Sequence, residues 1–215
     1  DEALSPVVAL PGGGSLIVSQ TPALTAIDVN SGGADAGSRE QTALEVDLEA
    51  AAEAARQVRL RNISGLIVID FVPVRDAGHK RQVLDALRDA ATGDPAGPHV
   101  VGHTRMGLVE MTRRRHGPSL LEIMGEPWPA GAEPAPAKSS LTLALDALRG
   151  TLREARGKGA PRLVLRVPPA VAEAIQGPAR TALEEAEGLL GVAIEPAPDQ
   201  TLAPGAWDVG AWEGE

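Results

Sequence analysis

The stretch Gly65-Leu66-Ile67-Val68-Ile69-Asp70-Phe71 decides how the rest of the chain is organised. Four consecutive aliphatic residues after Gly65 predict a strand that is buried on both faces, as in the middle of a sheet flanked by helices. Asp70 stands where this strand ends. A carboxylate in that position either caps the following turn or acts as a ligand at the carboxyl edge of a sheet, where open α/β folds place their sites.

A second acid, Asp28, ends a similar apolar run that begins at Leu24 and continues to Asn30. Residues two apart in a strand point to the same side of the sheet, so Asp28 and Asn30 are expected to face one way together. We therefore predict that Asp28, Asn30 and Asp70 converge on one divalent metal ion. The alternative is that each aspartate caps a turn and that Asn30 is a turn residue in the left-handed conformation.

The order of the elements around this stretch predicts an α/β fold with a mixed sheet layered by helices. Residues 39–61 have the clearest helical period, and residues 1–13 form a flexible lead into the first strand. The strands at 15–20 and 24–30 are expected to be antiparallel. The other predicted elements are a helix at 76–91 and strands at 66–71, 99–103 and 107–111.

A run rich in proline and glycine divides the chain into three parts: 1–124, a linker at 125–138, and 139–215. The last part has the pattern of a small α/β domain. Its predicted helices are 139–157, 168–175 and 178–190, and its predicted strands are 162–167 and 191–195. Trp207 and Trp212, in its tail, either anchor this domain or stack on bases.

Composition and charge limit the classes of function. The 215 residues can bury a sizeable core, and the net charge of −9 argues against a general nucleic-acid binder. The strongest local basic cluster is Arg113-Arg114-Arg115-His116. The chain has no cysteine, membrane segment or signal peptide, so we expect a cytoplasmic protein. It does not begin with methionine, and we expect it to be part of a longer polypeptide.

Six stretches follow one another in an order and at a spacing that are specific to one family. They are Ala23–Ser31, Asp47–Ala51, Ala54–Arg61, Gly65–Phe71, His79–Leu84 and Gly107–Arg115. Together they resemble the ribonuclease E/G endoribonucleases, over the deoxyribonuclease-I-like catalytic subdomain of that family. The resemblance covers residues 14–124 well. Residues 139–215 resemble the small C-terminal domain of the family only in the order and pattern of their elements.

This resemblance implies a metal-dependent nuclease. Asp28 and Asp70 would bind Mg²⁺, with Mn²⁺ as an alternative ion, and Asn30 would support the same site. The family cuts single-stranded RNA internally and leaves a 5′-phosphate and a 3′-hydroxyl, so the expected partner is single-stranded RNA. The small domain of the family contributes to subunit pairing, which implies a homodimer.

The sequence also departs from the family pattern. Gly125 and Trp128 stand where the family has the paired cysteines that share a zinc ion, so no zinc link is expected. The loop after Asn30 is not basic, and Val72-Pro73-Val74 carries no further acid. The S1 RNA-binding domain and the 5′-end sensor, which precede this region in the family, have no counterpart in these 215 residues.

Six basic side chains are candidates for contact with RNA phosphates. They are His79, Arg81, Arg105, Arg113, Arg114 and Arg115. The alternative for the arginine cluster is a solvated strand end, and His79 could instead pack or cap at a helix start. His79 and His103 are the candidates for a general base.

Two other functions remain open at this point. The first is a catalytically weak or inactive RNA-binding or oligomerisation module of the same family. The second is a different phosphodiesterase on the same fold.

Overall fold

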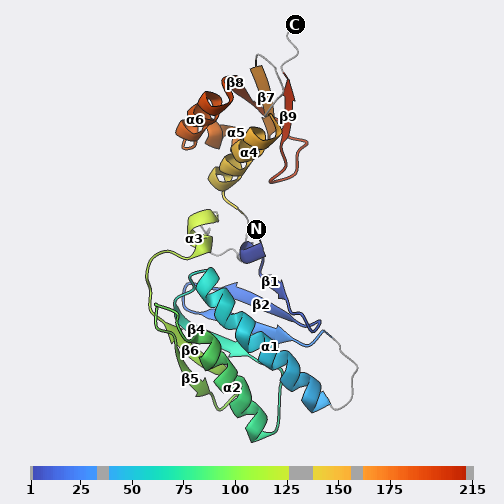
Figure 1. Ribbon diagram of the computed structural model, residues 1–215, viewed down its shortest axis with the longest axis vertical. Coiled ribbons are helices and arrows are strands. Elements are labelled where there is room, and N and C mark those ends of the chain that lie inside the picture. Colours follow the sequence, from blue (N-terminus) through green and yellow to red (C-terminus); the bar gives the residue numbers. More distant parts are fainter. Residues whose placement is uncertain (1, 33–38, 126–137, 156–161, 212–215) are drawn as a thin grey trace. The chain divides into compact units, whose positions relative to one another are not determined.

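The computed structural model describes residues 2–32, 39–125, 138–155 and 162–211, which form two compact units (Figure 1). Of the described residues, those up to 123 belong to the first unit and those from 124 onward belong to the second. Each unit has its own hydrophobic core. Among the described residues, no helix combines the length and the apolar character that a membrane crossing requires.

The first unit is built on a six-stranded sheet with the order β1-β2-β3-β4-β6-β5. Only β3 and β4 pair in parallel, and all other neighbours are antiparallel. This mixed sheet confirms the predicted α/β class. The strands are β1 (Val7–Ala9), β2 (Ser15–Gln20), β3 (Thr25–Asn30), β4 (Gly65–Asp70), β5 (His99–His103) and β6 (Val109–Arg113).

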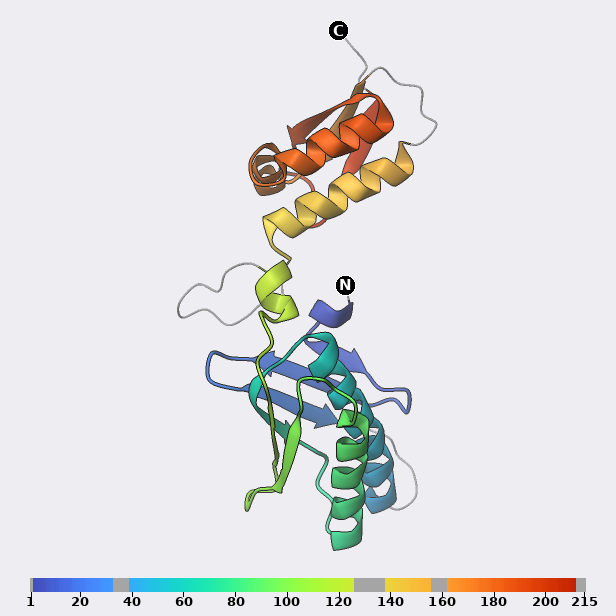
Figure 2. The same ribbon diagram turned by 60° about the vertical axis from the view of Figure 1, so that its left-hand side comes forward.

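The two long helices of this unit, α1 (Arg39–Leu60) and α2 (Ala77–Ala91), pack side by side on the same face of the sheet (Figures 1 and 2). Ile67 and Ile69 of β4 point toward them and are fully buried, whereas Leu66 is 44% exposed. The prediction that this strand is buried on both faces was wrong. Inward and outward side chains alternate along this strand as usual. The sequence does not show this alternation, because the outward positions are also aliphatic.

The chain turns sharply between α1 and β4. Asn62 ends the helix in the left-handed conformation (φ 49°), and the Ile63 amide donates to the Val58 carbonyl. This bonding satisfies carbonyls that a helix end otherwise leaves unpaired. Gly65 then starts the strand with φ 87°, a value that favours glycine.

The second unit is a small α/β layer, in which a three-stranded sheet has the order β8-β7-β9. β7 (Arg162–Val167) runs parallel to β8 (Ala193–Pro198) and antiparallel to β9 (Asp208–Ala211). The helices of this unit are α4 (Ser140–Glu154), α5 (Pro169–Gln176) and α6 (Arg180–Leu190). Trp207 packs against its core, as expected for an anchor, and Trp212 lies outside the described residues.

Several predicted boundaries were wrong. The lead segment contains a short 3₁₀ helix, η1 (Glu2–Leu4), and strand β1, which pairs with β2. The strand predicted at 107–111 begins at Val109, because residues 104–107 form a turn in which the Gly107 amide donates to the Thr104 carbonyl. A short helix, α3 (Leu120–Met124), precedes the predicted linker, most of which (126–137) lies outside the described residues.

Candidate metal centre at the ends of two parallel strands

The structure brings Asp28 and Asp70 together. They are register partners in the parallel pair of β3 and β4, so their backbones are about 4.8 Å apart, the usual spacing of neighbouring strands. Both side chains are exposed and belong to the face of the sheet that the helices leave open. Backbone pairing between the two strands therefore sets the position of one carboxylate beside the other.

Asn30 lies two residues beyond Asp28 on the same side of β3. Its side-chain Nδ2 donates a hydrogen bond of 2.9 Å to Oδ2 of Asp28. This bond occupies one lone pair of the carboxylate and fixes its orientation. Asp28, Asn30 and Asp70 are thus neighbours at the ends of the paired strands, and their convergence on one metal ion stays a prediction.

The donor set suits a hard divalent cation. Mg²⁺ prefers oxygen ligands, keeps several of its waters, and is commonly bound through one or two carboxylates together with substrate phosphates. Within the described ranges, no cluster of three or more acids, histidines or cysteines could hold a metal by itself. Two exposed carboxylates fit an ion of this kind, whereas a structural zinc site needs four protein ligands.

A cavity of about 140 Å³ opens next to Asp70. Its apolar wall includes Phe71, Val83 and Met106, and its polar lining includes Lys80, His103 and Asp47. This space has room for on the order of ten water molecules, since one water needs roughly 10–15 Å³. The cavity therefore provides room for part of a substrate next to Asp70.

Asp47 lies on the inward side of α1 and was not among the predicted site residues. Its side chain is fully buried, and Oδ1 accepts a 2.9 Å hydrogen bond from the Val72 amide. Oδ2 is buried without a partner. Burial raises the pKa of this carboxyl to about 7, against a smaller lowering by the Val72 amide. Asp47 thus holds the loop that follows Asp70.

The two candidate general bases differ in their polar contacts, which involve one ring nitrogen of His79 and both ring nitrogens of His103. His79 Nδ1 lies 3.4 Å from Oε1 of Glu40, which also accepts from the Arg75 and Asp76 amides. His103 Nδ1 lies 3.2 Å from the Gly107 carbonyl, and Nε2 lies 3.5 Å from the Lys80 carbonyl. These contacts tie the start of α2 and the β5–β6 turn to their neighbours.

The structure corrects the prediction that Arg113 contacts phosphate. This side chain is only 5% exposed, and its Nε and Nη2 donate to the carboxylate of Asp94. Its Nη1 donates to Asn62 Oδ1 and to the Ile63 carbonyl. Arg113 is a structural side chain because β6 extends to residue 113 and turns it inward.

The other four predicted arginines are exposed. Arg81 is 84% exposed and lies 3.6 Å from Asp85, and Arg115 is 67% exposed and lies 3.7 Å from Glu122. Arg105 and Arg114 are also exposed. Pairs of this kind are weak in water, so these side chains can exchange their partners for phosphate.

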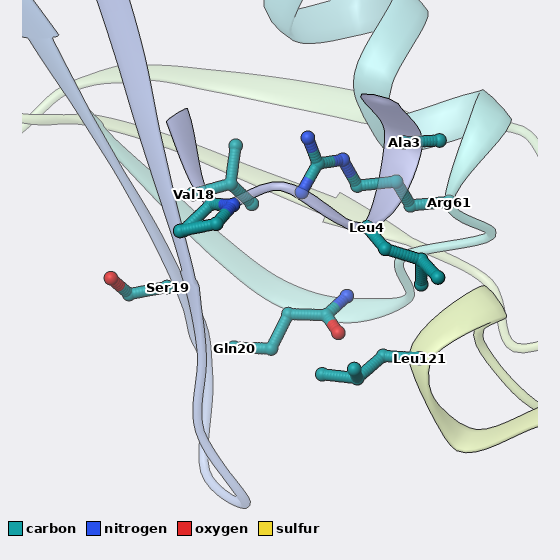
Figure 3. Close-up of a pocket in the computed structure, with 8 residues that line it drawn as sticks. Ala3, Leu4, Val18, Ser19, Gln20, Arg61 and Leu121 are labelled. Carbon is teal, nitrogen blue, oxygen red and sulfur yellow. The ribbon is translucent and has the colours of Figure 1, made fainter. Parts of the chain in front are cut away.

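A second cavity, of about 70 Å³, lies near the opposite ends of β3 and β4 (Figure 3). Arg61 and Gln20 both line this cavity. Arg61, like Asp47, was not among the predicted site residues, although the helical period of this segment could have indicated both. Asp47 and Arg61 fall on the inward stripe of the helix, at three- and four-residue steps from Ala54 and Val58, where a charged residue requires an explanation.

The position expected for the family's zinc-binding thiols is only partly described. Gly125 forms an isolated antiparallel bridge with Lys138, and Trp128 lies outside the described residues. The sequence has no cysteine, so the absence of a zinc link stays a prediction drawn from composition.

Comparison with known proteins places these features in one family. The model of the ribonuclease E/G family matches residues 1–116. Ribonuclease G of Escherichia coli K12 is 36% identical over 200 residues, which are 90% of this chain and 41% of that protein. Ribonuclease E of Haemophilus influenzae is 37% identical over 196 residues, 91% of this chain and 21% of that protein.

A third relative matches a shorter region more closely. Ribonuclease E of Nostoc is 45% identical over 130 residues, which are 60% of this chain and 19% of that protein. The chain thus spans less than half the length of each of these relatives. The match to the family model covers more than half of the chain and includes both strand-end aspartates. This chain belongs to the ribonuclease E/G family.

Proposed function

We propose that this chain carries the catalytic carboxylates of a Mg²⁺-dependent endoribonuclease, which hydrolyses phosphodiester bonds of single-stranded RNA. The observation that carries the proposal is the register pairing of Asp28 with Asp70 at exposed strand ends. The products are a 5′-phosphate and a 3′-hydroxyl, and cytoplasmic RNA processing is the expected setting. Family membership and the names of the relatives, ribonucleases E and G, support the choice of substrate.

Asp28 and Asp70 are the side chains that would hold Mg²⁺ or Mn²⁺. A bound divalent ion polarises a phosphoryl oxygen and stabilises the charge that develops on it. Asn30 holds one oxygen of Asp28 by its 2.9 Å hydrogen bond, so that the carboxylate is oriented before substrate arrives. Orientation in advance lowers the entropy lost in the reaction.

The cavity beside Asp70 gives the substrate a place to lie. Lys80 lines it and can neutralise a phosphate, while Phe71 and Met106 offer an apolar wall to a nucleotide. In the hydrolysis, water attacks phosphorus and the bond from phosphorus to the 3′-oxygen breaks. The leaving oxygen takes a proton to become the 3′-hydroxyl. The proton of the attacking water passes to solvent or to a substrate oxygen.

The first prediction concerns Asp70. Purified chain with Mg²⁺ and a 5′-fluorescent single-stranded RNA should give shorter products, and Asp70→Asn should reduce the rate at least about 100-fold, because it removes a charged ligand. Asp85→Asn is the matched control. Asp85 is an exposed acid on α2 of the same unit, and its surface pairs contribute little. Cleavage by the Asp70 variant at the wild-type rate would exclude this residue from the reaction.

A second candidate is an RNA-binding or oligomerisation module without turnover. The net charge of −9 and the burial of Arg113 favour it, since both reduce the attraction for phosphate. Filter binding at low salt separates the two functions. Retained Mg²⁺ binding without measurable RNA affinity favours the module. Cleavage of DNA or small phosphoesters in preference to RNA would instead indicate a different phosphodiesterase.

We also propose that the chain pairs as a homodimer through residues 139–215. The second unit exposes Leu141 and Leu189, which are 40% and 76% exposed, and apolar side chains of this kind occur at subunit contacts. Sedimentation velocity of the intact chain measures the state directly. A monomer across the micromolar range would contradict this part of the proposal.

A further inference from the structure

Two arginines of the first unit are almost fully buried, and they differ in what surrounds them. Arg113 and Arg61 are each 6% exposed. Every donor group of Arg113 has a partner, and two of its nitrogens donate to the Asp94 carboxylate. Arg61 donates from Nε to Gln57 Oε1 at 2.7 Å, but its Nη2 is buried without a partner.

No carboxylate among the described residues is in contact with Arg61. The nearest compensation is indirect, through Gln57, whose Nε2 donates to Oε1 of Glu53. That carboxylate is already bound by Arg56 in a two-bond pair. Burial lowers the pKa of the Arg61 guanidinium, and the Glu53 charge opposes this only in part. A guanidinium stays charged in proteins, so its burial without a counter-charge is costly.

Arg61 is one of the residues that line the 70 Å³ cavity (Figure 3). Gln20 also lines it, and Leu4, Val18 and Leu121 form apolar walls. One buried guanidinium, one amide donor and apolar sides make a pocket for a small anion carried on an apolar stem. The two parallel strand ends with Asp28 and Asp70 are at the other edge of the sheet, so this pocket is a separate site.

We propose that this pocket binds the carboxylate of a glutamate or aspartate side chain presented by a partner polypeptide. The planar guanidinium matches a carboxylate in two-bond geometry, and Gln20 can donate to the same group. The methylene stem of a glutamate would lie against Leu4, Val18 and Leu121.

The surroundings favour a carboxylate over the phosphates of RNA. Among the residues that line the pocket, Arg61 is the one cation. A nucleic-acid groove instead tracks several phosphates with several basic side chains. A single buried cation with apolar walls therefore fits one acidic side chain better than a phosphate backbone.

The test uses the intact ¹⁵N-labelled chain and follows the Arg61 Nε and Gln20 amide signals by NMR. The probe is the blocked peptide N-acetyl-Ala-Leu-Glu-Ala-amide, and its control has glutamine in place of glutamate. We expect saturable shifts of both signals with the glutamate peptide in the millimolar range. Binding of the glutamine peptide should be at least about tenfold weaker, because charge-assisted hydrogen bonds are about twice as strong as neutral ones.

Two variants separate binding from folding. Arg61→Lys keeps the charge but loses the planar fork, and it should weaken peptide binding about tenfold or more. Gln20→Leu keeps the wall and removes one donor, so it should weaken binding less. Equal shifts from the two peptides, or no shift from the glutamate peptide, would overturn the proposal. Shifts produced only by inorganic phosphate or an oligouridylate would assign the pocket to phosphate and would overturn it as well.

Discussion

At the scale of single residues, this chain places charged groups where the usual preference is for apolar ones. Asp47 is fully buried on the inward stripe of α1, and one of its oxygens has no partner. The Val72 amide stabilises the other oxygen. Because the side chain is fully buried, the neutral carboxylic acid is favoured over the carboxylate.

The free energy of unfolding should therefore depend on pH through the titration of Asp47. Its pKa is raised to about 7 in the folded state and is near 4 in the unfolded chain. Below about pH 4 both states bind the proton. Between about pH 4 and pH 7 only the folded state keeps it, so the contribution of Asp47 to stability falls as the pH rises through this window.

Asp47→Asn should remove this penalty. The amide oxygen can still accept from Val72, and no charge is buried. We expect the variant to gain up to a few kcal/mol in unfolding free energy at pH 8 and almost nothing at pH 4. Urea denaturation at the two pH values measures the difference. A variant that loses stability equally at both values would show that Asp47 is not the source of the pH dependence.

The buried ion pair of Arg113 with Asp94 should contribute to the stability of the first unit. Arg113→Ala leaves Asp94 without the guanidinium that lowers its pKa, in a position where its side chain is 6% exposed. Breaking a buried pair on one side costs about 3–5 kcal/mol. Arg114→Ala, at an exposed neighbour, should change stability by no more than about 0.5 kcal/mol. Thermal unfolding of the two variants compares them, and equal losses would contradict the assignment of Arg113 as structural.

At the scale of secondary-structure elements, helices were easier to predict than the limits of strands. The periodic run at 39–61 gave α1 to within one residue, since its apolar positions repeat at helical steps over more than five turns. By contrast, β1 was missed because Val7–Ala9 is short and lies between Pro6 and Pro11. It becomes a strand by pairing with β2, a contact that local sequence does not encode.

The candidate site, too, was predictable from the sequence only in part. The acids at the ends of β3 and β4 were predictable, because an acid that ends an apolar run is visible in the sequence. The inward orientation of Arg113 was not predictable, because three consecutive arginines do not indicate which of them pairs with Asp94, 19 positions earlier in the sequence. The cavities beside Asp70 and Arg61 also depend on how distant segments pack.

Two glycines in helices of the second unit are expected to respond in opposite ways to replacement by alanine. A Cβ at Gly150 in α4 would lie 2.6 Å from ring atoms of Trp207, whereas a Cβ at Gly188 in α6 would meet nothing within 4 Å. Gly150→Ala should therefore destabilise this unit by about 1–3 kcal/mol through overpacking. Gly188→Ala should stabilise it by about 0.5–1 kcal/mol. Trp fluorescence during urea unfolding reads both, and the opposite order of stabilities would contradict the packing of Trp207 on α4.

At the scale of the whole molecule, the two units have separate cores. Ile69 belongs to the first core and Leu165 to the second, and both side chains are fully buried. Neither sheet shares a strand with the other. The described residues therefore contain two sets of apolar contacts that can unfold independently.

Hydrogen exchange can test this independence. Ile69→Ala should cost about 2–5 kcal/mol and accelerate exchange in β3, β4 and α1, while leaving the amides of β7 and β8 protected as in the wild type. Leu165→Ala should give the reverse pattern. Loss of protection throughout the chain in either variant would show that the two units unfold as one.

The register of β3 against β4 has a consequence for how this family can diverge. Asp28 and Asp70 are aligned by main-chain hydrogen bonds, which any sequence able to form the two strands supplies equally well. Mutations that exchange one aliphatic side chain for another beneath the sheet therefore leave the two acids side by side. A single inserted residue within either strand would turn one acid to the opposite surface. Drift in side-chain identity is thus tolerated here, and a change in strand length is not.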